Sequence, residues 1–119
     1  MTSVGSYLPV NKYSNDDLSK FVETSDEWIY KRSGIKNRHF VSQEETTSDL
    51  ASYAGLKAIE NSKLEKKDIN LLIVATTTPD NTFPSTATLV QKKIGIKGVA
   101  FDVQAVCAGF VFALSIAKS

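Results

Sequence analysis

The spacing of apolar residues changes about halfway along the chain. After Thr46, small and apolar residues recur at helical spacing: Leu50, Ala51, Ala54, Ala58 and Ile59. This pattern predicts an amphipathic helix, and its small residues favour close packing against a sheet. Further on, residues 71–75 and 99–103 form short continuous apolar runs. Such runs are typical of strands that are covered on both faces, as in a parallel sheet.

Polar residues at capping positions mark where helices should begin. Ser14, Thr24 and Thr46 each precede an acidic residue by three positions, which is the spacing of a capping box. We therefore expect a helix after each of the three. Gly34 stands where a left-handed residue would end the second of these helices. The apolar face of the first would consist of Leu18, Phe21 and Val22.

The second half of the chain alternates helices with strands. Pro84 and Ser85 open a helix between the two apolar runs, and residues 108–117 form a final helix that is apolar all round. This alternation predicts a parallel α/β sheet. A further short strand is possible near residues 3–8. A helix without a polar face is normally buried inside a larger fold, so we expect the sheet to be incomplete and a segment to be missing after Ser119.

Composition narrows the class of protein. The chain has 119 residues, which suits one domain, and a formal net charge of +1 with acids and bases interspersed. This balance gives no reason to expect nucleic acid or an anionic membrane as a partner. A single cysteine excludes an internal disulfide and favours a reducing compartment. No apolar run is long enough for a membrane span, and residues 1–5 lack the features of a signal peptide, so we expect a cytoplasmic protein.

Cys107 is the candidate for chemistry. It follows the second predicted strand and precedes the final helix, where backbone N–H groups and the helix dipole stabilise a thiolate. Ala108 and Gly109 carry almost no side chain, so a substrate carbonyl could approach the sulfur and nearby backbone donors. The alternative is a structural role, because a free cysteine commonly behaves as a small buried hydrophobic residue.

Several sequence blocks, in order and with matching spacing, resemble the β-ketoacyl-acyl carrier protein synthase III family. The cysteine block reads AVCAGF, and the segment before Gly34 reads TSDEWI followed by RSGI. The blocks that carry the resemblance are residues 5–9, 24–29, 32–35, 38–39, 75–78, 83–85, 95–98, 101–103 and 105–110. Together they cover nearly the whole chain, which would be the N-terminal part of such a protein.

The resemblance implies a fold and an activity. The family has the thiolase fold, in which two similar α/β halves form an αβαβα layered structure, and residues 1–119 would be its N-terminal domain without the C-terminal half. Its members condense an acyl-CoA primer with malonyl-acyl carrier protein and release carbon dioxide. We therefore expect an acyltransferase that starts fatty acid synthesis, with acetyl-CoA as primer, as a homodimer of the full-length protein. No metal and no cofactor are expected, because acyl-CoA is the substrate.

The resemblance also implies roles for individual residues. Cys107 would carry the acyl group, Trp28 would stack on the CoA adenine, and Arg32 would reach the CoA phosphates. Thr24 falls where another CoA contact is expected, and Phe83 would cross the dimer interface to bound the partner's acyl pocket. Each of the aromatic and charged residues has an alternative, since Trp28 and Phe83 could pack in a core and Arg32 could be a solvated surface charge.

Other features of the sequence restrict the activity that can be expected of these 119 residues. The only histidine, His39, lies in a block without known chemistry and is expected to be structural or at the surface. Val106 stands where the family tends to have a smaller residue. The family's His and Asn, which handle the malonyl group, would have to come from beyond this segment. These 119 residues alone are expected to be poorly soluble and unable to catalyse condensation.

Other functions stay open at this point. The chain could be a non-catalytic truncated fragment or an interaction module. It could also belong to a related condensing enzyme of the hydroxymethylglutaryl-CoA synthase or polyketide synthase type.

Overall fold

The computed structural model describes all residues from Met1 to Ser119, and they divide into two compact units. One unit consists of Met1–Tyr7 and Thr46–Ser119 and is called the sheet unit below. The other consists of Leu8–Glu45 and is called the hairpin unit. Each unit has its own secondary structure and its own candidate site.

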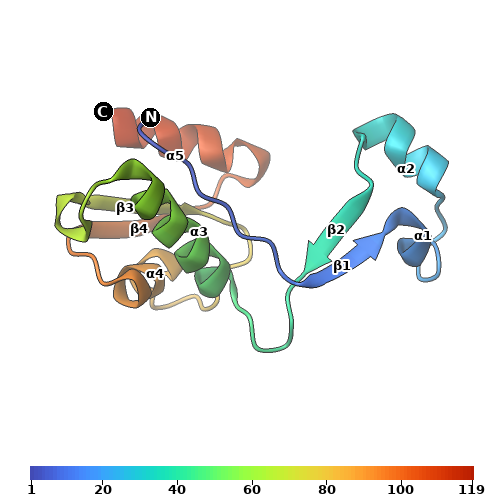
Figure 1. The fold of residues 1–119 in the computed structure, drawn as a ribbon, viewed down its shortest axis with the longest axis horizontal. Helices are drawn as coiled ribbons and strands as arrows, with labels where there is room; N and C mark the ends of the chain where they lie inside the picture. The colour runs from blue at the N-terminus through green and yellow to red at the C-terminus, as the bar shows by residue number, and fades with distance from the viewer. The chain divides into compact units, whose positions relative to one another are not determined.

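The sheet unit is built around two parallel strands, β3 (Leu71–Ala75) and β4 (Val99–Val103). They pair in a continuous register from Leu71 opposite Val99 to Ala75 opposite Val103. The three helices of the unit are α3 (Thr47–Ser62), α4 (Thr86–Ile94) and α5 (Gly109–Lys118), and α4 is the crossover between the strands (Figure 1). Single 3-10 turns at Lys66–Asp68 and Val106–Ala108 precede β3 and α5. The predicted strands and the α/β class are confirmed.

The core of the sheet unit lies between α4, α3 and the strands. Val90 and Ile94 of α4 are 2% exposed, and Ile96 joins them just after the helix. Partly buried residues of α3, of β3 and of the segment just before β3 pack against this cluster: Ala51, Ile59, Ile69, Leu72 and Val74. Burying a side chain of this size stabilises the fold by roughly 1.5–3 kcal/mol, so the apolar stripe of α4 holds this helix on the sheet.

Both ends of α4 are specified by side chains or by a glycine. The carboxylate of Asp102 on β4 accepts hydrogen bonds from the Thr86 and Ala87 amides, each 2.7 Å long. Ser85 caps the same end by accepting from the Thr88 amide. The helix ends at Gly95, whose φ of 78° is in the left-handed region that glycine adopts without strain.

Residues 3–8 do not form the strand that was considered possible from the sequence. They run along α3 instead, where the Ser3 hydroxyl donates to the Ala58 carbonyl over 2.6 Å. The side chain of Asn61 donates to the Val4 carbonyl over 2.9 Å. A side chain at Gly5 would collide with the Ala54 carbonyl oxygen, so this segment lies against the helix backbone. The segment is therefore held by hydrogen bonds to the helix rather than by pairing with a neighbouring strand.

The hairpin unit contains an antiparallel strand pair that the sequence patterns did not predict. Strand β1 (Asn11–Ser14) pairs with β2 (Asn37–Phe40). Two helices, α1 (Asn15–Leu18) and α2 (Asp26–Ser33), lie between them in the chain. Asn15 is 1% exposed and binds three partners: its amide nitrogen donates to Asp26 and to the Ile35 carbonyl, and its oxygen accepts from Arg38. These bonds join the two helices to the end of the strand pair.

Two predictions about the first helices were wrong. Although Ser14 and Asp17 form the expected capping box, α1 is a single turn, and Phe21 and Val22 lie beyond it with 76% and 58% of their surface exposed. The second helix is capped by Ser25 and not by Thr24, since the Ser25 hydroxyl accepts from the Trp28 amide. Gly34 ends α2 with a φ of 69°, as predicted.

An ion pair joins the first turn of α3 to α4. Thr46 and Asp49 form the predicted capping box, and Lys93 of α4 donates to the Asp49 carboxylate over 2.6 Å. The hydrogen bond from Lys93, followed by those from Thr46, lowers the pKa of Asp49 from 3.8 to about 2. A lowered folded-state pKa means that this stabilisation is complete above about pH 3.8 and is lost as the pH falls toward 2.

We predict that Asp49→Asn reduces the acid sensitivity of the sheet unit. The substitution should lower the free energy of unfolding by about 1 kcal/mol at neutral pH, because the pair is partly exposed and screened. The loss should shrink as the pH falls from about 3.8 through 2, because Asp49 then becomes protonated first in the unfolded and finally in both states. Urea unfolding of the two proteins at several pH values measures this. A difference that stays constant with pH would contradict the role of the Asp49 charge.

Candidate active site and nucleotide cleft

Cys107 lies between the carboxyl end of β4 and the start of α5. It is the middle residue of the 3-10 turn Val106–Ala108, and it is an exposed free thiol. The Ala108 amide donates to the Ala105 carbonyl over 2.9 Å, and the Gly109 amide donates to the Val106 carbonyl. These bonds close the turn and hold the cysteine backbone. The Ala108 and Gly109 amides are therefore engaged within the turn.

A cleft of about 810 Å³ adjoins the cysteine within the sheet unit. Cys107 lines one part of the cleft together with the apolar residues Val106 and Phe110, and the remaining lining residues are apolar as well. The other lining residues come from α3, β3, α4 and α5: Ala51, Gly55, Leu71, Leu72, Ile73, Val74, Ala75, Val90, Ile94, Ala113, Leu114 and Ala117. None of the lining side chains is charged, so the cleft suits an apolar group that is attached to the sulfur.

Gly109 brings α5 close to β3 beneath the cysteine. The residue is buried, and a Cβ atom added to it would lie 3.3 Å from the Cβ atom of Ala75. A separation of this size is tighter than ordinary van der Waals contact between carbon atoms. The small residues at these two positions thus allow the helix that follows Cys107 to approach the strand.

Val106 has an unfavourable backbone conformation directly before the cysteine. Its φ is 45°, in the left-handed region, which is a genuine outlier for a β-branched residue. Its side chain is 74% exposed, so little burial compensates for this conformation. The chain therefore turns sharply at Val106, and Cys107 is presented at the surface of the unit.

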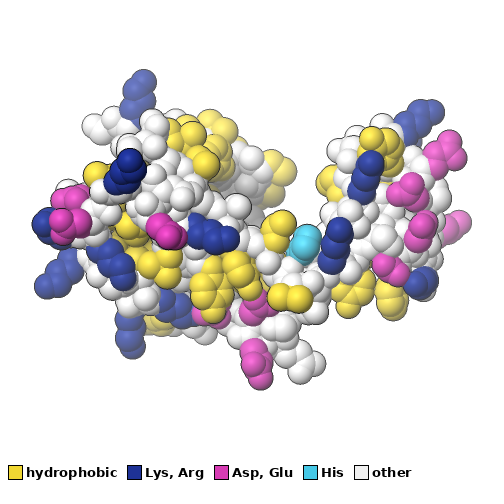
Figure 2. All heavy atoms as spheres, in the orientation of Figure 1, with side chains coloured by type: hydrophobic (Ala, Val, Ile, Leu, Met, Phe, Trp, Pro, Cys, Tyr) yellow, Lys and Arg dark blue, Asp and Glu magenta, His cyan; other side chains and the backbone are white.

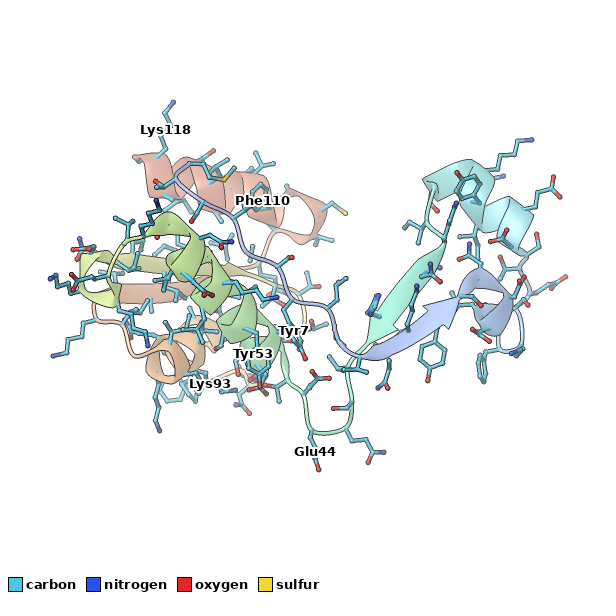
Figure 3. All side chains as sticks on the ribbon, in the orientation of Figure 1. Tyr7, Glu44, Tyr53, Lys93, Phe110 and Lys118 are labelled. Atoms are coloured by element: carbon cyan, nitrogen blue, oxygen red, sulfur yellow. The ribbon has the colours of Figure 1, made fainter.

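The apolar side chains of α5 are largely exposed beside this site. Phe110 is labelled on α5 in Figure 3, and hydrophobic side chains gather over this helix in Figure 2. The exposed residues are Phe110, Val111, Phe112, Leu114 and Ile116. The sequence expectation that nothing within these residues covers the helix is confirmed.

The hairpin unit holds a second cleft, of about 530 Å³, along α2. It is lined by Ser25, Glu27, Trp28, Lys31 and Arg32. The guanidinium carbon of Arg32 lies 4.7 Å from the centre of the Trp28 ring, and the indole is 56% exposed. The spacing of four residues thus places both side chains on one cleft. An exposed aromatic face beside a cation can bind a planar ring that carries negative charge.

Thr24 and His39 take no part in the α2 cleft. The Thr24 hydroxyl is buried without a hydrogen-bond partner, and Thr24 does not line the cleft. The Nδ1 atom of His39 lies 2.6 Å from the Pro9 carbonyl oxygen. Because a carbonyl oxygen only accepts, the proton is on Nδ1 and His39 has a structural hydrogen bond within the unit.

Phe83 lies on the loop between β3 and α4, and 89% of its surface is exposed. Hydrogen bonds to α3 hold the part of the loop that precedes Phe83. The Asp80 carboxylate accepts from the amide and hydroxyl of Ser48, and the Thr47 hydroxyl donates to the Thr78 carbonyl. Burial raises the pKa of Asp80, but the hydrogen bonds from Ser48 and Thr46 and the charge of Lys93 together outweigh it and lower the pKa overall. Phe83 is thus an exposed aromatic residue on an anchored loop.

Sequence reasoning missed some residues of both clefts. Lys31 is adjacent to Arg32 and three residues after Trp28, so helical spacing alone could have placed it beside the indole. Glu27 was considered only as the partner of Thr24 in a capping box, and Ser25 only as a member of the block of residues 24–29. The wall that α3 contributes to the cysteine cleft depends on packing between distant segments, which no local pattern records.

The chain has curated relatives of high sequence identity. The chain is 58% identical over 117 residues to β-ketoacyl-[acyl-carrier-protein] synthase III of Ehrlichia canis, covering 98% of the chain and 37% of that protein. It is 57% identical over 121 residues to the enzyme of the same name from Neisseria gonorrhoeae, covering 100% of the chain and 38% of that protein. The chain thus spans little more than a third of the length of these curated relatives. A scan against family models gave no match.

Solved structures agree with the sequence comparison. The structure of 3-oxoacyl-[acyl-carrier-protein] synthase III from Aquifex aeolicus superposes with a TM-score of 0.90 at 48% identity, over 98% of this chain and 38% of that one. The priming β-ketosynthase of the R1128 polyketide pathway gives a TM-score of 0.90 at 32% identity, over 98% of this chain and 35% of that one. The fold is therefore a part of the thiolase fold.

Over nearly its whole length, the chain is similar to a part of the β-ketoacyl-[acyl-carrier-protein] synthase III sequences, as its sequence blocks indicated. None of its helices is long and apolar enough to cross a lipid bilayer. No three His, Cys, Asp or Glu side chains gather in a group that could hold a metal ion.

We predict that Val106→Gly stabilises the sheet unit. Glycine adopts a positive φ freely, which removes a cost of about 1–2 kcal/mol, while its greater freedom in the unfolded chain costs about 0.5–1 kcal/mol. The net gain in unfolding free energy should therefore be up to about 1 kcal/mol, measured by urea unfolding. Val106→Ala, which keeps a Cβ atom, is the control and should gain less. A destabilised glycine variant would mean that the valine side chain contributes packing instead.

Proposed function

We propose that the protein is a ketoacyl synthase III-type acyltransferase that transfers the acyl group of acyl-CoA to Cys107. The observation that carries the proposal is the exposed thiol at the mouth of an apolar cleft, at the junction of β4 and α5. The sequence and fold relationships described above support the same activity. The primer is proposed to be acetyl-CoA, and the acyl acceptor in the second step to be malonyl-acyl carrier protein.

The acyl-transfer step needs a thiolate and a clear approach to it. The Cys107 sulfur attacks the thioester carbonyl carbon, a new carbon–sulfur bond forms, and the bond to the CoA sulfur breaks. The proton that Cys107 gives up balances the proton that the departing CoA thiolate takes up. Ala108 and Gly109 leave the sulfur accessible because they carry almost no side chain. The acyl chain then occupies the apolar cleft lined by Val106 and Phe110.

The CoA nucleotide is proposed to bind along α2. Trp28 offers an exposed indole for the adenine, and Arg32 offers a positive charge for phosphate within the same cleft. Thr24 is proposed only as a supporting residue, since its hydroxyl is buried beside the start of the helix. The guanidinium of Arg32 is already stacked on the indole, so a base would use the free part of the ring or displace the arginine.

The remaining parts of the proposal concern assembly and location. Phe83 is proposed to lie at a homodimer interface and to bound the acyl pocket of the partner, which its exposure on an anchored loop supports. We further propose a cytoplasmic enzyme that uses no metal and no cofactor beyond its CoA substrate. Condensation with malonyl-acyl carrier protein needs groups that handle the malonyl carboxylate, and none of the residues described above is assigned to that step.

We predict that Cys107 becomes acylated. Incubating the full-length protein with acetyl-CoA should add one acetyl mass to the peptide that contains Cys107. Cys107→Ser should abolish this transfer, because a serine hydroxyl provides no comparable nucleophile without a base. Peptide mass spectrometry measures both results. An unmodified Cys107 peptide from a folded protein that still consumes acetyl-CoA would contradict the assignment.

We predict that Trp28→Ala and Arg32→Ala raise the KM for acyl-CoA about tenfold or more and change kcat less. Both residues bind the nucleotide far from the reacting bond, so their loss removes binding that the ground state and the transition state share. Steady-state kinetics with acetyl-CoA measures the effect, and thermal unfolding checks that the variants are folded. An unchanged KM in folded variants would assign both residues to packing.

A further inference from the structure

The α2 cleft contains a second cation that the proposed nucleotide contacts leave unused. Lys31 lines the cleft together with Arg32 and Trp28, and its side chain is exposed. The three ion pairs of the chain are Lys20–Asp17, Lys67–Glu65 and Lys93–Asp49. Neither Lys31 nor Arg32 takes part in any of them. Both cations are therefore available to an anion that enters the cleft.

The charges within the cleft are not balanced. Glu27 is the only acidic residue that lines it, and although it precedes Lys31 by one helical turn, the two form no ion pair. One positive charge is therefore in excess beside the exposed indole. By contrast, Lys36 of the same unit lies 5.3 Å from the centre of the Tyr30 ring and does not line the cleft. The excess charge favours a ligand that combines an aromatic ring with more than one anionic group.

Lys31 and Arg32 leave the helix in different directions. Neighbouring residues of an α-helix are rotated by about 100° around its axis, so two adjacent cations that line one cleft reach different parts of it. Arg32 lies over the Trp28 ring, which places its charge next to a stacked base. Lys31 has no such ring contact and can reach a group on another side of the ligand. Two separate cations suit two separate phosphate groups better than one.

We infer that Lys31 binds the 3′-phosphate of the nucleotide while Arg32 binds its 5′-phosphates, and that this second contact selects nucleotides phosphorylated at both the 3′ and 5′ positions of the ribose. In coenzyme A these are the 3′-phosphate and the 5′-diphosphate, which point away from each other. The inference rests on the proposed CoA site and adds a specificity-determining residue to it. Dephospho-CoA, which lacks only the 3′-phosphate, is the discriminating ligand.

The test measures the affinity of the full-length protein for CoA and for dephospho-CoA by isothermal titration calorimetry. The wild-type protein should bind CoA about two- to fivefold more tightly than dephospho-CoA, the range for one exposed charge pair. Lys31→Gln should remove this preference by weakening CoA binding alone. Lys31→Arg should keep the preference. Lys36→Gln makes the same change of charge outside the cleft and should leave both affinities unchanged.

The outcomes separate this inference from the proposed function. If CoA binding needs Trp28 and Arg32 but Lys31→Gln leaves the ratio of the two affinities unchanged, Lys31 is not a specificity residue and only the inference fails. The same holds if Lys31→Gln weakens both ligands equally. If CoA binding survives Trp28→Ala undiminished, the nucleotide does not bind along α2, and the proposed site fails together with the inference.

Discussion

The carboxylate of Asp102 is the interaction on which the arrangement of the sheet unit depends. It projects from the middle of β4 and binds two backbone amides at the start of α4, where the helix dipole adds to the attraction. This fastens the crossover helix to the second of the two strands that it connects. With α4 held in this position, β3 and β4 can pair, and Val90 and Ile94 of the helix face the core. The turn that bears Cys107 begins directly beyond this strand.

The two candidate sites use different physical means to expose a functional group. In the sheet unit, a left-handed residue at Val106 and a close helix approach at Gly109 hold the thiol in a tight turn. In the hairpin unit, a regular helix is capped by Ser25, and residues one turn apart line a common cleft. The first depends on contacts between segments that are distant in the chain, and the second depends on local helical geometry alone.

This difference explains what the sequence could predict. The strands 71–75 and 99–103, the capping boxes at Ser14 and Thr46, and the left-handed Gly34 were predictable because each depends on a few neighbouring residues. The pairing of β1 with β2 was not, because it is organised by the buried Asn15, which reads as an ordinary polar residue. The cap of α2 was misplaced by one residue because Thr24 and Ser25 are both good capping residues. The family resemblance, in contrast, was carried by short blocks that need no tertiary information.

Gly109 and Ala75 lie far apart in the chain but approach each other closely, so the size of side chain tolerated at one depends on the residue at the other. Each has room for its present side chain only because the other is small, so a larger residue at one is tolerated only with a smaller or shifted residue at the other. Both positions adjoin the cysteine cleft, and Ala75 lines it. The distance between α5 and β3 therefore depends on both Gly109 and Ala75. Related proteins that accept bulkier acyl groups beside the cysteine would be expected to change these two residues together.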